Sequence, residues 1–164
     1  MRLGIMYFVA VILTALALAP AAAQLLALPV RLSLSDQDYV FMQYLSHGWA
    51  WAWLVAPAAF VADIVLVVMF RQRGAFKLVS LAALLIACTF LIDCFGIFPV
   101  DRITAHWAIL PPNWASLRER WEYSSAINAL LIFLSFCALA LSAPVLRRIP
   151  GRASGYGMDL WYLR

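Results

Sequence analysis

The sequence predicts an all-α protein, an integral membrane four-helix bundle whose helices cross the lipid bilayer. Charged residues make up 12% of its 164 residues and hydrophobic residues 66%, and the mean hydropathy is +0.90. Soluble domains carry about 25% charged residues. The apolar stretches are about 20 residues long and lack the alternation of membrane β-strands. Because lipid offers no hydrogen bonds to the backbone, such stretches must be helical.

The first predicted span covers about residues 3–30, and Pro20 within it is expected to kink the helix. A second interpretation is a cleavable secretory signal, since a basic N-terminus and an apolar run precede the small residues 21–23. Apolar character resumes at residues 25–28, so we expect an uncleaved helix.

Three more spans follow, each long enough to cross about 30 Å of hydrocarbon. They cover about residues 49–70, 78–100 and 126–146. The second contains Asp63 and the third Asp93. A carboxylate facing lipid is costly, about 3 kcal/mol on insertion scales. We therefore expect Asp63 to face the bundle, with its carboxyl either protonated or hydrogen-bonded, for example to Thr14 or Ser142.

The basic residues predict the orientation through the positive-inside rule. Eight lie on one side of the spans (Arg2, Arg71, Arg73, Lys77, Arg147, Arg148, Arg152, Arg164) and four on the other (Arg31, Arg102, Arg118, Arg120). The first side is then cytoplasmic and holds both termini, while two longer outer loops cover about residues 31–48 and 101–125. Residues 1–164 would form one transmembrane domain, multi-pass in a cell membrane such as the bacterial inner membrane.

The segment 147–164 is expected to be a cytoplasmic interfacial tail. It ends in an aromatic sequence that includes Trp161 and Tyr162. Tryptophan and tyrosine favour the membrane–water interface. These two residues are candidates for contact with lipid headgroups or with a partner protein.

Two capping boxes are predicted on the outer side, where a serine hydroxyl and an acid three residues later pair with free amides. Ser35 and Asp38 predict a helix that begins near Asp36. Ser116 and Glu119 predict a helix that continues into the last span.

That last helix carries one polar and aromatic stripe, because successive residues turn by about 100°. Its members are Trp114, Arg118, Trp121, Glu122, Ser125, Asn128 and Ile132. Such a stripe should face protein or a cavity. We expect Arg118 to pair with Glu122 and the two tryptophans to cover the mouth of the bundle, with Asp93 and Asn128 just beneath. The stripe either packs the bundle or lines a ligand pocket.

The segment Trp107–Glu122 carries Pro111-Pro112-Asn113-Trp114 and the pattern Trp-x3-Arg-x-Arg-Trp. It resembles the motif of a four-helix membrane family that includes the fungal anthrone oxygenases. The resemblance implies a membrane enzyme that needs no cofactor and oxidises an apolar aromatic substrate. Such chemistry requires a base and a dry cavity. The candidate bases are Asp93, His106, His47 and Glu122, with Arg118 in the same site.

Other functional classes are disfavoured by the pattern of residues. The chain has two histidines, both on the outer side, and no spacing typical of metal ligands, so neither a metal site nor a bound cofactor is expected. Cys88, Cys94 and Cys137 lie inside apolar spans and are expected to be packing residues. The positive charges flank the spans, which argues against nucleic acid as a partner.

Two functions remain, and whether the protein is an enzyme stays open. One is an accessory or structural subunit packed against a larger membrane complex, which the sparse catalytic residues favour. The other is an anthrone-oxygenase-like enzyme that binds an apolar small molecule in an outer-facing pocket. The candidate ligand- or partner-binding residues are Trp114, Trp121, Ser125, Asn128, Trp161 and Tyr162.

Overall fold

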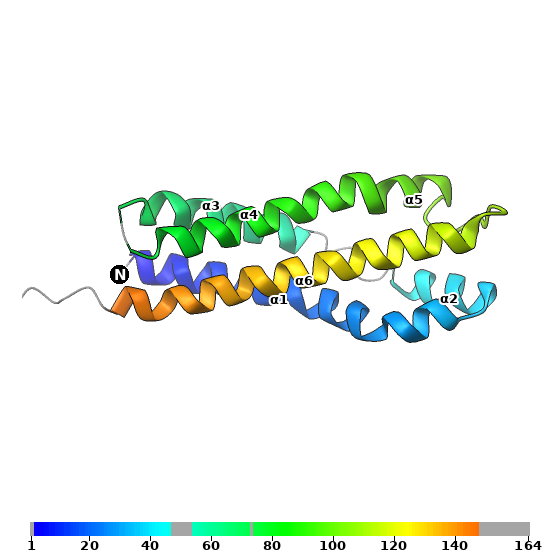
Figure 1. Cartoon of the computed structure of the whole chain (residues 1–164), viewed down its shortest axis with the longest axis horizontal. Helices are drawn as coiled ribbons and strands as arrows, with labels where there is room; N and C mark the ends of the chain where they lie inside the picture. Colours follow the sequence, from blue (N-terminus) through cyan, green and yellow to red (C-terminus); the bar gives the residue numbers. More distant parts are fainter. Residues whose placement is uncertain (1, 47–53, 73, 148–164) are drawn as a thin grey trace, which may run out of the picture.

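The computed structural model describes residues 2–46, 54–72 and 74–147. The regular elements of these residues are helices. They are α1 (Arg2–Ser33), α2 (Asp36–Ser46), α3 (Val55–Phe70), α4 (Phe76–Ile92), the π-helix η2 (Asp93–Ile97), α5 (Phe98–Ile103) and α6 (Trp114–Arg147). Because α4, η2 and α5 follow one another without a break, they form a single long rod (Figure 1).

The bundle consists of four shafts, namely α1, α3, the rod α4–η2–α5 and α6, and each contacts two neighbours. Helix α1 contacts α3 and α6, and α4 contacts the same two helices. The start of α1 and the end of α6 lie at one end of the molecule, which we call the terminal end (Figure 1). Helices α2 and α5 lie at the other end, the distal end. The assignment of the terminal end to the cytoplasm stays a prediction.

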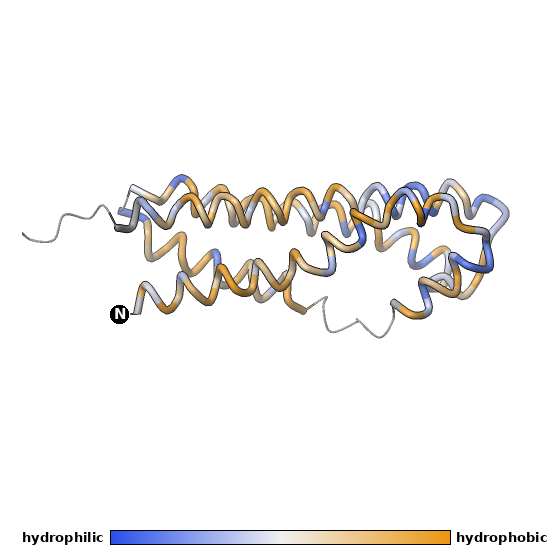
Figure 2. The backbone as a smooth tube through the Cα atoms, turned by 90° about the horizontal axis from the view of Figure 1, so that it is seen from below, coloured by the Kyte–Doolittle hydropathy of each residue, from blue (hydrophilic) through white to orange (hydrophobic). Residues whose placement is uncertain are grey.

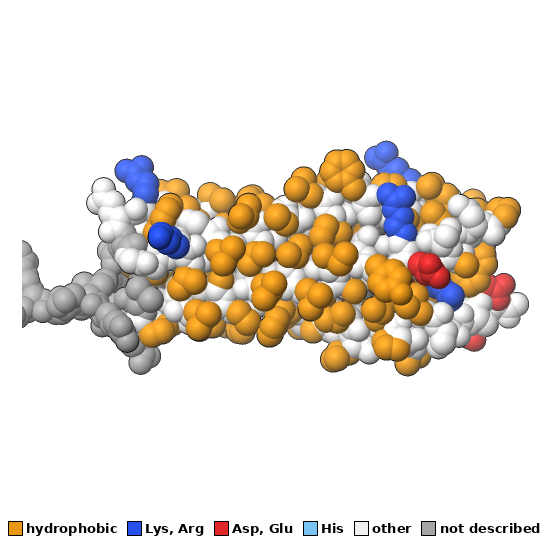
Figure 3. Space-filling model, in the orientation of Figure 1, with side chains coloured by type: hydrophobic (Ala, Val, Ile, Leu, Met, Phe, Trp, Pro, Cys, Tyr) orange, Lys and Arg blue, Asp and Glu red, His pale blue; other side chains and the backbone are white. Residues whose placement is uncertain are grey.

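The shafts are apolar over their length, as expected of a membrane protein. Within the described residues, three helical segments are long and apolar enough to span a bilayer, namely Leu3–Ser33, Phe76–Ile103 and Trp114–Pro144. Figure 2 shows hydrophobic residues along the shafts, and Figure 3 shows charged side chains gathered near the two ends. Large exposed side chains such as Phe8 and Leu84 lie on the flanks, where lipid would contact them.

Helix α3 differs from the predicted second span. Its 16 residues cover about 24 Å at 1.5 Å per residue, less than the hydrocarbon thickness of about 30 Å. Residues 49–53 of that predicted span lie outside the described part of the chain. The bundle therefore has three long shafts and one short one.

The two expected outer loops are largely helical. Helix α1 continues to Ser33, and α2 occupies most of the first expected loop. The start of the helix and the serine half of its capping box are confirmed, since the Ser35 hydroxyl accepts the Asp38 amide at 3.3 Å. The Asp38 carboxyl does not pair with a free amide as expected, because its Oδ2 atom accepts from the Ser35 hydroxyl at 2.6 Å. The box at Ser116 is wrong, because α6 already begins at Trp114 and the Ser116 hydroxyl donates to the Asn113 carbonyl instead.

In the terminal half, small residues let the helices approach closely. The core there combines Leu66, Phe70 and Leu139 with several alanines. Asp63 is fully buried in the bundle, which confirms that it does not face lipid. Its expected partners are wrong: Thr14 donates to the Ala10 carbonyl and Ser142 donates to the Leu139 carbonyl. Neither carboxyl oxygen of Asp63 has a hydrogen-bond partner among the described residues.

Candidate functional site

A cavity of about 820 Å³ occupies the distal half of the bundle. It lies at the level where α1 and α6 continue past the start of α3 at Val55. Its lining comes from α1, α2, the start of α3, the rod α4–η2–α5, the 104–113 segment and α6. The lining residues are Ala17, Pro20, Ala21, Ala23, Gln24, Ala27, Arg31, Met42, Gln43, Leu45, Ala56, Pro57, Thr89, Phe90, Asp93, Ile97, Phe98, Asp101, His106, Trp107, Trp121, Ser125, Asn128 and Ile132.

The cavity has two kinds of wall. Helix α1 and the start of α3 contribute mostly alanine and proline, for example Ala21 and Pro57. The facing elements contribute the rings of Phe90, Trp107 and Trp121. Small side chains on one wall leave the volume open, and aromatic rings on the other offer a flat apolar surface.

Asp93 and Asn128 provide a polar pair on this lining. The Asn128 Nδ2 group donates to Asp93 Oδ1 at 2.6 Å. Helical phase and depth predicted that these two residues lie at one level, and this is confirmed. The Asn128 Oδ1 atom is buried and has no hydrogen-bond partner within the described residues.

The π-helix η2 begins at Asp93, where the rod departs from α-helical geometry. π-Helical turns are rare and frequently occur at functional sites. Gly96 lets this turn approach α6 closely, since a Cβ atom there would lie 2.3 Å from Ser124 Oγ and 2.8 Å from Ser124 Cβ. The Arg120 side chain donates to the Phe95 carbonyl of the same turn at 2.5 Å.

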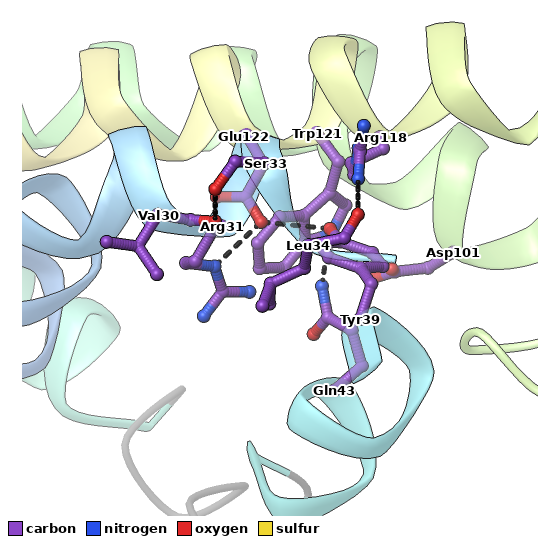
Figure 4. Close-up of polar contacts among 10 residues, drawn as sticks. All are labelled: Val30, Arg31, Ser33, Leu34, Tyr39, Gln43, Asp101, Arg118, Trp121 and Glu122. Carbon is purple, nitrogen blue, oxygen red and sulfur yellow. Dashed lines mark hydrogen bonds and ion pairs between the residues drawn. The ribbon is translucent and has the colours of Figure 1, made fainter. Parts of the chain in front are cut away.

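The distal end is held by a buried ion pair that the sequence analysis assigned to the wrong arginine. Arg31 Nε donates to Glu122 Oε1 at 2.8 Å. The Tyr39 hydroxyl donates to the same oxygen at 2.9 Å, and Gln43 Nε2 donates to the Tyr39 oxygen at 2.8 Å (Figure 4). Desolvation by burial, together with the negative charge of Glu122, raises the pKa of Tyr39 well above its ordinary value of 10, so the hydroxyl stays a donor.

Arg118 does not pair with Glu122 in the described structure. Its Nη1 atom donates to the Leu34 carbonyl at 2.8 Å (Figure 4). Its guanidinium lies 4.7 Å from the Trp114 ring centroid. The reason is that Arg31, on the last turn of α1, reaches the Glu122 carboxylate directly and displaces Arg118 to the α1–α2 turn. The missed signal was a basic residue at the end of an apolar span, on the side rich in acids.

Aromatic rings close the distal end, which confirms that Trp114 and Trp121 pack there. Tyr39 and Trp107 meet edge to face with centroids 4.9 Å apart, and Trp107 and Trp121 do so at 6.4 Å. Trp121 Nε1 donates to Asp101 Oδ1 at 3.0 Å. The cluster also contains Ile97, Val100 and Leu117.

The segment that contains Trp107 has an unusual backbone conformation. Ala105, His106 and Trp107 all have positive φ, at 48°, 56° and 66°. This left-handed region is uncommon outside glycine and costs about 1–3 kcal/mol per residue. Hydrogen bonds from His106 N to the Asp101 carbonyl (2.7 Å) and from Trp107 N to Thr104 Oγ1 (3.1 Å) hold it. The segment thereby turns the Trp107 side chain inward.

The predicted site residues divide into three groups. Asp93, His106, Trp121, Ser125 and Asn128 share the cavity lining. Glu122 is buried beside it, and Trp114 and Arg118 pack on Tyr39 outside it. His47, Trp161 and Tyr162 lie outside the described residues.

The described residues hold no group of three histidine, cysteine or acidic side chains that could bind a metal ion. Comparisons of the chain with protein-family models, with curated proteins and with solved structures find no match.

Proposed function

We propose that this membrane protein binds an apolar small molecule in the distal cavity, with the Asp93–Asn128 pair contacting its polar group. The observation that carries the proposal is a cavity of about 820 Å³ with mostly apolar walls and one polar pair on its lining. Small-molecule sites have volumes of about 300–1,000 Å³ and this kind of lining.

A packing role alone accounts poorly for these features. A bundle built only for rigidity would pack side chains into this pocket. Polar side chains at membrane depth are also costly and tend to serve a function. Here Ser125 and Asn128 accompany Asp93 on the wall of the open volume.

Binding can be tested with 2-naphthol on the full chain in lipid nanodiscs, using quenching of tryptophan fluorescence. Ala21→Phe should fill the cavity and abolish binding. Ala19→Phe is the matched control, since Ala19 is an exposed alanine of the same helix outside the lining. Absence of saturable binding, or equal binding by the two variants, would contradict the proposal.

A second candidate is oxygenation in the same cavity, favoured by the position of the Asp93 carboxyl on the lining and by the resemblance of the Trp107–Glu122 segment to the anthrone oxygenase family. Asp93 would remove a proton from an activated ring methylene, and the carbanion would reduce O₂. One oxygen atom would end in the new ring carbonyl and the other in water. Oxygen uptake with anthrone should then require Asp93, and Asp93→Asn should abolish it while 2-naphthol still binds.

The role of accessory subunit rests on the sparse catalytic residues and on the aromatic tail, which lies outside the described residues. It stays a prediction. Gentle purification of the full chain, followed by mass determination, checks it: a partner present in stoichiometric amount supports the role, and a chain purified alone contradicts it.

A further inference from the structure

Three cavity-lining side chains carry a buried polar atom with no hydrogen-bond partner in the described part of the chain. They are Arg31 Nη2, Trp107 Nε1 and Asn128 Oδ1. The exposed fractions of these residues are 4%, 4% and 9%. Because buried polar groups are almost always paired, three such atoms around one cavity indicate that a ligand completes them.

The two unpaired donors lie at the same end of the cavity. The Arg31 guanidinium lies 5.9 Å from the Tyr39 ring centroid and 5.5 Å from that of Trp121. Trp107 packs edge to face on the same two rings. Arg31 and Trp107 therefore flank one pair of rings, and Figure 4 shows the Arg31 guanidinium extending between α6 and α2.

The charge at this end is already balanced. Glu122 accepts from Arg31 and is itself buried, so the pair is neutral as a unit. A ligand carboxylate would add an uncompensated negative charge in a medium of low dielectric constant, which is unfavourable. An uncharged oxygen can accept from an N–H donor at this end without that penalty.

We propose that Arg31 and Trp107 form an acceptor subsite for an uncharged oxygen, such as a ketone or aldehyde carbonyl. The distal cavity then selects neutral lipophilic carbonyl compounds over carboxylates of the same shape. This inference rests on the proposed binding function and adds the chemical class of the ligand.

The test uses three probes of one shape: pyrene, 1-pyrenecarboxaldehyde and 1-pyrenecarboxylate. Affinities are measured on the full chain in nanodiscs and corrected for partition into protein-free nanodiscs. The wild-type protein should prefer the aldehyde to the carboxylate by at least about tenfold, because the carboxylate would be buried without a counter-charge.

Trp107→Phe keeps a ring and removes the N–H donor. It should lower the affinity for the aldehyde about fivefold to tenfold and leave that for pyrene unchanged. Trp114→Phe is the matched control, because Trp114 packs on Tyr39 outside the cavity lining. Its ratio of aldehyde to pyrene affinity should equal that of the wild type.

Glu122→Gln tests the charge argument separately. It leaves the Arg31 charge uncompensated and should raise the affinity for the carboxylate relative to the aldehyde about tenfold. An ion pair with only a structural role would change the affinities for all three probes alike. If Trp107→Phe fails to fold, the wild-type preference and Glu122→Gln still decide the inference.

The proposed function and the acceptor subsite are contradicted by different results. If pyrene itself shows no saturable binding, the proposed function is wrong and the inference falls with it. If pyrene binds but the wild type shows no preference for the aldehyde, or Trp107→Phe and Trp114→Phe give the same ratio, the acceptor subsite is wrong and cavity binding stands.

Discussion

Arg31 and Glu122 lie 91 positions apart in the sequence, yet they form a 2.8 Å ion pair with side-chain exposures of 5% and 1%. The pair joins the last turn of α1 to α6 at the distal end of the bundle. It also anchors Tyr39 of α2, which shares the Glu122 oxygen. One carboxylate thus holds three helices together.

Arg31→Met should destabilise the protein by about 3–5 kcal/mol, because it leaves Glu122 buried without a counter-charge. The double variant Arg31→Met/Glu122→Leu should recover most of that loss. Unfolding in mixed micelles measures both, and Arg102→Met, at an exposed position, is the control. A double variant as unstable as the single one would show that the charge imbalance is not the cause.

Gly96→Ala should destabilise the bundle by about 1–3 kcal/mol, the usual cost of overpacking. The new Cβ would overlap Ser124 Oγ and Cβ, so η2 and α6 would have to separate. Ser124→Gly in the same chain should restore much of the stability. Gly4→Ala, where nothing lies within 4 Å of the new Cβ, is the control and should not be destabilising. Equal losses in the two single variants would contradict the predicted close approach.

Asp63→Val should stabilise the bundle by about 1–3 kcal/mol, since it replaces a fully buried carboxyl without a partner among the described residues by an apolar side chain of similar shape. Asp63→Asn keeps the polarity and should gain less. Thermal unfolding in detergent compares them. A loss of stability in Asp63→Val would mean that the carboxyl makes an interaction the bundle needs.

Tyr39→Phe should cost about 1–3 kcal/mol near neutral pH, because Gln43 and Glu122 lose their shared partner. The folded state raises the pKa of Tyr39, so this contribution is present below pH 10 and is lost as the pH rises above 10. The stability difference between wild type and Tyr39→Phe should therefore shrink between about pH 10 and 12. Tyr123→Phe, at an exposed position, controls for the removal of a hydroxyl. A difference that stays constant up to pH 12 would contradict a buried, protonated Tyr39.

Sequence periodicity predicted those features of the fold that depend on a single helix. The apolar spans, the start of α2 and the buried stripe of α6 follow from composition and from the helical turn. The common depth of Asp93 and Asn128 was also predicted, because the depth of a residue along each shaft follows from counting residues. Partner choice between distant helices did not follow, and the Arg118–Glu122 expectation failed for this reason.

The cavity could not be predicted, because it depends on where α3 begins relative to α1 and α6. The inward turn of Trp107 was also beyond the pattern, since three consecutive residues with positive φ have no signal in alanine, histidine and tryptophan. What the pattern did contain was the cluster of tryptophans at the edge of the last span. This cluster indicated the end of the molecule at which the site lies, the distal end, but not the geometry of the site.

The shortness of α3 has a consequence for how the chain enters the membrane during synthesis. A 16-residue helix that carries Asp63 is a weak insertion signal, because an aspartate at mid-helix costs about 2.5–3.5 kcal/mol. Helix α4 begins only a few residues after α3 ends, and it covers the α3 face in the finished fold. Helices α3 and α4 are then best inserted together, as one hairpin whose second arm shields the carboxyl of the first. If α3 entered the membrane before α4, the Asp63 carboxyl would lack the helix that covers it in the finished fold.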